Sequence, residues 1–121
     1  MLQDQLFTFT KLQTDADDVK TTIIFNPSHP IFEGHFPDRP ILPGVCMMQI
    51  VKEIAALHLG KKIKLVKAQE LKFLSFINPE ENGSVQMELS VRTENNDVKI
   101  DARLLDDLTT FFKFKGQFVL Q

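Results

Sequence analysis

A histidine and the predicted start of a helix lie close together in the segment GHFPDRPILPGV, residues 34–45. Three prolines stiffen the loop that joins His35 to Gly44. A neutral imidazole can take a proton from the carbon next to a carbonyl, and unpaired amides at a helix start can hold the negative charge that develops on oxygen. The spacing therefore favours enolate chemistry, with His35 as general base and the backbone of Gly44 and Val45 as oxyanion donors. The alternative role for His35 is to anchor the loop.

Gln49 follows Gly44 by one helical turn and is the only strongly polar side chain between Val45 and Val51. A carboxamide donates and accepts hydrogen bonds but cannot deliver a proton to a leaving hydroxide. We therefore expect Gln49 to bind a substrate hydroxyl, a water or a backbone group instead of acting as an acid. Glu53 could reach the same site, but a full turn displaces it by about 5.4 Å, which favours a solvent-exposed pair with a lysine such as Lys52 or Lys61.

Three further residues could react but lack supporting neighbours in the sequence. Cys46 lies near the helix start, where a thiolate would be stabilised, although an unpaired cysteine is more often a small buried apolar residue. His29 precedes a proline in a turn, and His58 lies near the end of the helix, where a cationic ring would complement the helix dipole. The histidines and the cysteine do not have the spacing of metal ligands, and the sequence contains no glycine-rich phosphate loop.

The elements that must position these residues are one helix and several strands. Residues 45–59 are apolar on most of the helix circumference and end at Gly60, a natural helix terminator. A strand is predicted at 21–25, and four more follow the helix at 64–76, 85–91, 98–104 and 112–120, separated by turns at 78–83, 95–96 and 106–107. This order predicts an α+β fold in which one long buried helix packs on a curved antiparallel sheet.

Composition sets the limits on function class. The chain has 121 residues, a net charge of -2 and 43% apolar residues, which predicts a single globular domain spanning 1–121 and gives no overall reason to expect nucleic-acid or membrane binding. One cysteine and no basic apolar leader predict a cytoplasmic protein without a disulfide. Four lysines follow the helix and either form a solvated face or contact an acidic carrier protein or a pantetheine phosphate: Lys61, Lys62, Lys64 and Lys67.

The segment His29 to Ala56 resembles the hotdog-fold β-hydroxyacyl-acyl carrier protein dehydratases of fatty-acid synthesis. In that family a G-H-F-P-x-x-P-x-x-P-G-V loop opens the central helix, and this chain matches every fixed position with Gly34-His35-Phe36-Pro37, Pro40 and Pro43-Gly44-Val45. The strand pattern and residues 68–79 are similar more loosely, so the likeness extends over most of the chain.

The resemblance implies a hotdog fold and a homodimer or higher homo-oligomer whose sheets join edge to edge, with the active site at the subunit interface. His35 of one subunit would be the base, and Gln49 of the other would stand where the family has its acid. Gly44, Val45, Phe36 and Pro43 would bind the substrate. Four phenylalanines could line an apolar tunnel or simply belong to the core: Phe32, Phe36, Phe73 and Phe76.

The predicted function is that of a 3-hydroxyacyl-thioester dehydratase of fatty-acid or related acyl-chain biosynthesis, acting on acyl carrier protein or coenzyme A thioesters. No metal or redox cofactor is expected, because the thioester already acidifies C2. Two alternatives remain at this point. The chain could be a non-catalytic acyl-carrier-binding or partner subunit that has lost the acid, or a hotdog thioesterase in which His35 and Gln49 orient water.

Overall fold

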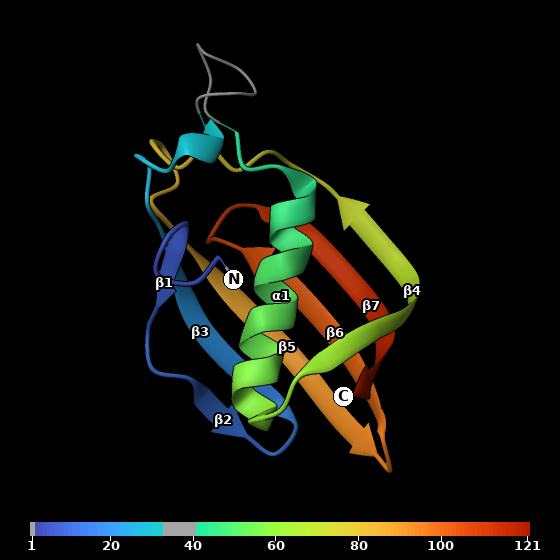
Figure 1. The fold of residues 1–121 in the computed structure, drawn as a ribbon. Coiled ribbons are helices and arrows are strands. Elements are labelled where there is room, and N and C mark those ends of the chain that lie inside the picture. The colour runs from blue at the N-terminus through green and yellow to red at the C-terminus, as the bar shows by residue number, and fades with distance from the viewer. Residues whose placement is uncertain (1, 33–40) are drawn as a thin grey trace.

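The computed structural model describes residues 2–32 and 41–121. A single long helix, α1 (Gly44–Leu59), lies in the hollow of a curved antiparallel sheet (Figure 1). The strands are β1 (Phe7–Phe9), β2 (Gln13–Asp15), β3 (Asp18–Phe25), β4 (Ile63–Phe73), β5 (Ser84–Glu94), β6 (Asp97–Leu105) and β7 (Thr110–Leu120), and a short 3-10 helix spans Pro30–Phe32. The predicted α+β architecture, one central helix wrapped by a curved sheet, is confirmed.

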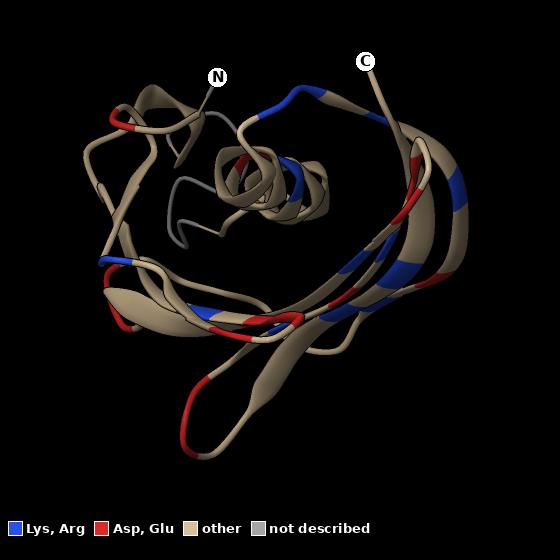
Figure 2. Cartoon of the chain, turned by 90° about the horizontal axis from the view of Figure 1, so that it is seen from below, with Lys and Arg blue, Asp and Glu red and all other residues tan. Residues whose placement is uncertain are grey.

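The sheet has seven strands in the order β1-β3-β5-β6-β7-β4, and β2 pairs with β3 beside this path. Viewed from below, the sheet bends around α1 (Figure 2), and along β5 and β6 the buried residues alternate with more exposed ones. Alternation along β5 and β6 produces this arrangement, because every second residue of an antiparallel strand points to the same face. In β5 the residues on the inner face of the sheet are buried: Val85, Met87, Leu89 and Val91. The residues between them are exposed or partly exposed on the outer face.

Strand β4 does not pair with β5, the next strand along the chain. It pairs with β7 at one edge of the sheet, and residues 74–83 connect β4 to β5 along the chain. A tight hairpin needs a loop of about two to five residues, so a ten-residue connection instead carries the chain across the end of the sheet. The sequence pattern also missed β1 and β2, which are only three residues long.

Both ends of α1 follow from local sequence. Pro43 precedes the helix with an extended backbone (φ -61°, ψ 144°), a conformation in which its ring is compatible with helix initiation. Gly60 ends the helix in the left-handed region (φ 68°), and the Lys61 amide donates to the Ala56 carbonyl. The buried face of the helix carries Met47, Ile50 and Ile54 into the core. Within the described ranges 2–32 and 41–121, no helix is long and apolar enough to cross a membrane.

Candidate active site at the start of helix α1

The start of α1 presents backbone donors without a side-chain cap. The Cys46 and Met47 amides donate to the Pro43 carbonyl at 3.0 and 3.4 Å, but the Gly44 and Val45 amides have no acceptor among the described residues. Such amides at the positive end of the helix dipole form a ready site for a negatively charged oxygen. Val45 is 75% exposed, so this helix end is accessible.

The residues around this helix end are held by the segment that follows β4. The Leu42 amide donates to the Ile77 carbonyl at 2.9 Å, and this hydrogen bond holds the residues just before α1 against the segment that follows β4. The ring of Phe73 packs directly on Gly44: a Cβ at position 44 would lie 2.7 Å from two ring carbons. Glycine at this position therefore lets the Phe73 ring pack directly on the helix start, and a larger residue would displace the ring.

The predicted site residues fall into two groups. Pro43, Gly44 and Val45 lie together at the start of α1, as the sequence implied, and Pro43 and Gly44 are partly buried. His35 and Phe36, the predicted base and a predicted substrate contact, lie outside the described residues. Their positions relative to the helix start therefore stay a prediction.

Gln49 leaves α1 on a different side from Gly44. Five residues along a helix rotate the chain by about 500°, so the two positions point about 140° apart. The side chain is partly buried, and none of the described residues forms a hydrogen bond with its amide. It lines a cleft of about 530 Å³ beside the helix, which extends to Gly60 and the first residues of β4. Within one protomer, Gln49 therefore lies on a different face of the helix from Gly44, although it is only about 40° around the helix from Val45.

Glu53 is buried, and the expected solvent-exposed pair with a lysine is wrong. Its side chain is 4% exposed, and its carboxylate accepts hydrogen bonds from the Leu2 amide (2.9 Å to each oxygen) and the Gln3 amide (3.0 Å). Backbone donors satisfy a buried carboxylate without a counter-ion, which explains how this charge is accommodated. The carboxylate is thus committed to holding the N-terminal segment on α1, and it does not substitute for the missing acid.

The other candidate side chains have structural roles. Cys46 is buried, and burial raises the pKa of its thiol, which disfavours the thiolate that a nucleophile needs. His29 accepts a hydrogen bond from the Ile31 amide through Nδ1 (3.0 Å), and His58 lies in the last turn of α1, as expected. No group of three His, Cys, Asp or Glu side chains in the described part of the chain is placed to hold a metal ion.

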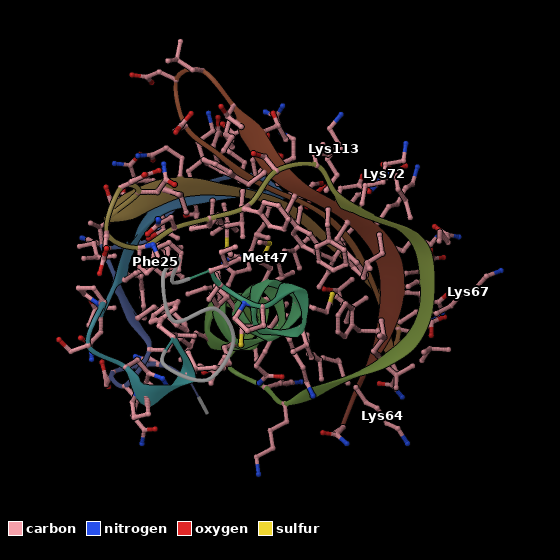
Figure 3. All side chains as sticks on the ribbon, turned by 90° about the horizontal axis from the view of Figure 1, so that it is seen from above. Phe25, Met47, Lys64, Lys67, Lys72 and Lys113 are labelled. Carbon is pink, nitrogen blue, oxygen red and sulfur yellow. The ribbon has the colours of Figure 1, made fainter. Side chains whose placement is uncertain are left out.

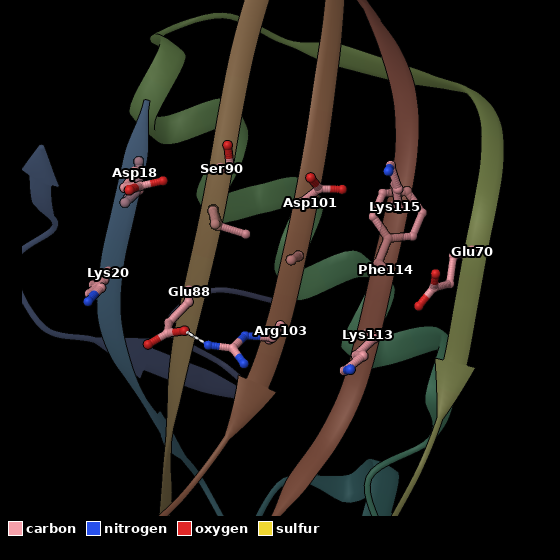
Figure 4. Close-up of a pocket in the computed structure, with 13 residues that line it drawn as sticks. Asp18, Lys20, Glu70, Glu88, Ser90, Asp101, Arg103, Lys113, Phe114 and Lys115 are labelled. Atoms are coloured by element: carbon pink, nitrogen blue, oxygen red, sulfur yellow. Dashed lines mark hydrogen bonds and ion pairs between the residues drawn. The ribbon is translucent and has the colours of Figure 1, made fainter. Parts of the chain in front are cut away.

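A shallow depression of about 450 Å³ lies on the outer face of the sheet, on the side away from α1 (Figure 4). Its lining alternates acidic and basic side chains, and Arg103 forms an ion pair with Glu88 across two neighbouring strands. Because the charges are of both signs and the sheet separates them from the helix, this depression has no part in the site at the start of α1.

Comparison with known proteins identifies the family. A family model described as ApeI dehydratase, ApeI-like, matches residues 11–110. The 3-hydroxyacyl-[acyl-carrier-protein] dehydratase FabZ of Caulobacter vibrioides is 26% identical over 95 residues, covering 74% of this chain and 52% of the relative. FabZ of Rickettsia typhi is 37% identical over 51 residues, covering 42% and 35%. The chain thus spans between about a third and about half of the length of these curated relatives.

Solved structures of similar fold agree with this assignment. The ApeI:P dehydratase heterocomplex of Xenorhabdus doucetiae contains a chain that superposes with a TM-score of 0.74 at 20% identity, covering 93% of this chain and 97% of the other. A putative thioesterase from Ralstonia eutropha superposes with a TM-score of 0.63 at 12% identity, covering 93% and 83%. At these identities the structures establish the hotdog fold alone. Since the family model covers most of the sequence, the chain belongs to the ApeI-like dehydratase family.

Proposed function

We propose that this protein dehydrates 3-hydroxyacyl thioesters to 2-enoyl thioesters in fatty-acid or related acyl-chain biosynthesis. The observation that carries the proposal is the start of α1, where the Gly44 and Val45 amides have no acceptor among the described residues and can bind the thioester oxygen. Membership of the dehydratase family and the named FabZ relatives support the reaction type. Residues 1–121 would form one hotdog domain, and the single unpaired cysteine fits a cytoplasmic location.

The reaction would use His35 as the proton carrier. The imidazole removes the C2 proton while the amides stabilise the enolate oxygen, and it then returns a proton to the C3 hydroxyl, which leaves as water. Gln49 would hold the C3 hydroxyl by a hydrogen bond. An amide cannot supply the proton itself, so His35 has to serve both steps and the reaction is expected to be slow.

The site would be completed by a second protomer, as the resemblance implies. The argument is that Gln49 lies about 140° around α1 from Gly44, and that β4 presents an edge that no described strand pairs, with exposed apolar side chains. These side chains are Leu65, Val66, Leu71 and Phe73, and Leu74 and Phe76 are also exposed in the segment just after β4. Exposed apolar surface on a free sheet edge favours pairing with another strand, so we expect β4 of two copies to join.

The substrate would be delivered by an acidic carrier protein or by coenzyme A. Lys64, Lys67, Lys72 and Lys113 project outward from β4 and β7 (Figure 3). Together with Lys61 and Lys62, which are exposed beside the cleft that contains Gln49, they form a basic margin near the proposed interface. Such a margin attracts an acidic protein or a phosphate at long range.

Product analysis on pantetheine thioesters tests this function. Purified protein is incubated with 3-hydroxyacyl- and acyl-pantetheine thioesters, and enoyl absorbance and free thiol are followed together. Enoyl formation that His35→Ala abolishes is the expected result. Release of thiol without enoyl product would instead identify a thioesterase, the activity suggested by the name of the Ralstonia structure.

A second candidate function is that of a partner subunit. It is favoured by Gln49 at the position of the family's acid and by the heterocomplex in which the similar Xenorhabdus chain was solved. In that case the chain alone forms neither enoyl product nor free thiol, but it co-purifies with a second hotdog dehydratase. Sedimentation of the isolated chain separates the two: a stable homodimer with activity supports the enzyme, and an inactive chain that dimerises only with the other subunit supports the partner role.

A further inference from the structure

We propose that Phe73 is a specificity-determining residue, whose ring limits the bulk of the acyl group next to the thioester. The inference rests on the proposed function, because it assumes that a thioester oxygen binds at the Gly44 and Val45 amides. The observation that carries it is the contact between the ring and Gly44: a Cβ on Gly44 would lie 2.7 Å from two ring carbons and 3.2 Å from a third.

The ring is fixed on two sides. Phe73 stacks on Phe112 with centroids 5.2 Å apart and an interplanar angle of 27°, and Phe112 is fully buried. Immediately after Phe73, the Leu74 amide donates to the Phe111 carbonyl at 2.9 Å and fixes the chain. Because the ring contacts both Gly44 and Phe112, turning it away costs part of its stacking contact with Phe112.

The rest of the ring is open. Phe73 remains 51% exposed despite these two contacts, so it offers an apolar surface beside the free amides. An oxygen that accepts from the Gly44 amide lies about 2.9 Å from that nitrogen, which places the first few carbons of the acyl group within reach of the ring. Phe76 is 74% exposed, and the three atoms nearest to a Cβ built on Gly44 all belong to Phe73, so Phe73 is the ring that lies against the helix start.

A rigid ring at this place discriminates against substituents near the carbonyl. One additional carbon in a filled pocket changes kcat/KM by roughly 10- to 200-fold. The protein should therefore prefer an unbranched acyl group over one that carries a methyl at C2, and shortening Phe73 should relax that preference. A 2-methyl-3-hydroxyacyl thioester keeps one C2 hydrogen, so it can still lose water.

The test compares two thioesters that differ by one methyl group. kcat/KM is measured for 3-hydroxybutanoyl- and 2-methyl-3-hydroxybutanoyl-pantetheine with the wild type, Phe73→Ala and Phe73→Leu. The branched-to-unbranched ratio should rise at least about tenfold in Phe73→Ala and change little in Phe73→Leu, which keeps most of the bulk. Leu108→Ala is the control, because Leu108 is 96% exposed in the turn between β6 and β7 and should leave the ratio unchanged.

Binding separates this inference from the proposed reaction. Dissociation constants of the corresponding but-2-enoyl and 2-methylbut-2-enoyl thioesters are measured by calorimetry with the same proteins. Enoyl formation by the wild type decides whether the protein is a dehydratase, whereas the ratio of the two constants reports on Phe73 even without turnover. A ratio that stays within twofold of the wild type in folded Phe73→Ala, or failure to bind either thioester, overturns the assignment.

Discussion

Adding a methyl group at Gly44 tests the geometry of the helix start directly. In Gly44→Ala the new Cβ would lie 2.7 Å from two carbons of Phe73, whereas carbon atoms in contact are normally about 3.5–4.0 Å apart. The ring tip must then move, and it loses some of its stack on Phe112, a contact worth about 0.5–1.5 kcal/mol. Alanine is favoured over glycine within a helix by about 1 kcal/mol. The two effects nearly cancel, so the free energy of unfolding of Gly44→Ala should lie within about 1 kcal/mol of that of the wild type.

A double-mutant cycle measures the interaction between positions 44 and 73, which the stability of the single variant does not show. With Phe73→Ala in place, the added methyl meets no ring, and Gly44→Ala should show only the helix gain. The two substitutions should therefore be coupled by about 1 kcal/mol, with Gly44→Ala more costly when the ring is present. Urea unfolding followed by far-UV circular dichroism measures all four proteins, since the chain has no Trp or Tyr for fluorescence. All four are compared at one protein concentration, because the apparent stability of an oligomer depends on concentration.

Additivity would refute this reasoning. Independent sites add to within about 0.3–0.5 kcal/mol, so a coupling energy inside that range would mean that Phe73 does not pack on Gly44 in solution. The pair Gly44→Ala and Leu108→Ala supplies the reference for additivity, because Leu108 is exposed in a distant turn.

Four further outcomes are expected. Gln49→Glu should raise the dehydration rate, by up to about 10² to 10⁴ if the new carboxyl acts as the acid, and an unchanged rate in a folded oligomer would count against its place in the site. Glu53→Gln should lower the unfolding free energy by about 1–3 kcal/mol in urea titrations. The carboxylate accepts hydrogen bonds from the backbone N–H groups of Leu2 and Gln3, whereas the NH₂ group of a glutamine side chain would face these donors with another donor. Gly116→Ala should destabilise by about 1–3 kcal/mol in the same assay, because its Cβ would lie 2.6 Å from the Lys67 carbonyl oxygen, which is backbone and cannot turn aside. Burial raises the pKa of the Cys46 thiol, so the folded protein keeps this thiol protonated at a pH where the unfolded chain ionises it. The unfolding free energy should therefore fall as the pH rises above about 8.5. A thiol reagent should react slowly with the folded protein and quickly once urea is added.

Much of the fold could be predicted because its signals are local. Strict alternation in β5 and β6 and the turn at Asn95, which adopts a positive φ of 56°, specify a hairpin without reference to the rest of the chain. The proline before α1 and the glycine after it set the helix ends to within one residue. The sequence did not predict β1 and β2, because a pattern of three residues is too short to distinguish a strand from a loop.

The candidate site was predictable only in its backbone part. The loop motif and the helix start identified Pro43, Gly44 and Val45, and the structure brings these three together without a capping side chain. No local pattern indicated that Phe73, 29 residues later, covers Gly44. The contact depends on β4 pairing with β7 at the sheet edge, which is a property of the whole sheet.

By itself, the sequence determined the strand alternation, the limits of the helix and the residue types available at its start, because each depends on near neighbours in the chain. The tertiary structure alone decided that Glu53 is buried under the Leu2 and Gln3 amides and that β4 lies beside β7. These features join residues as far apart in the chain as Ile63 and Leu120. Which distant groups meet depends on how the sheet curves and where its edge strands pair, and residue spacing along the chain does not contain that information.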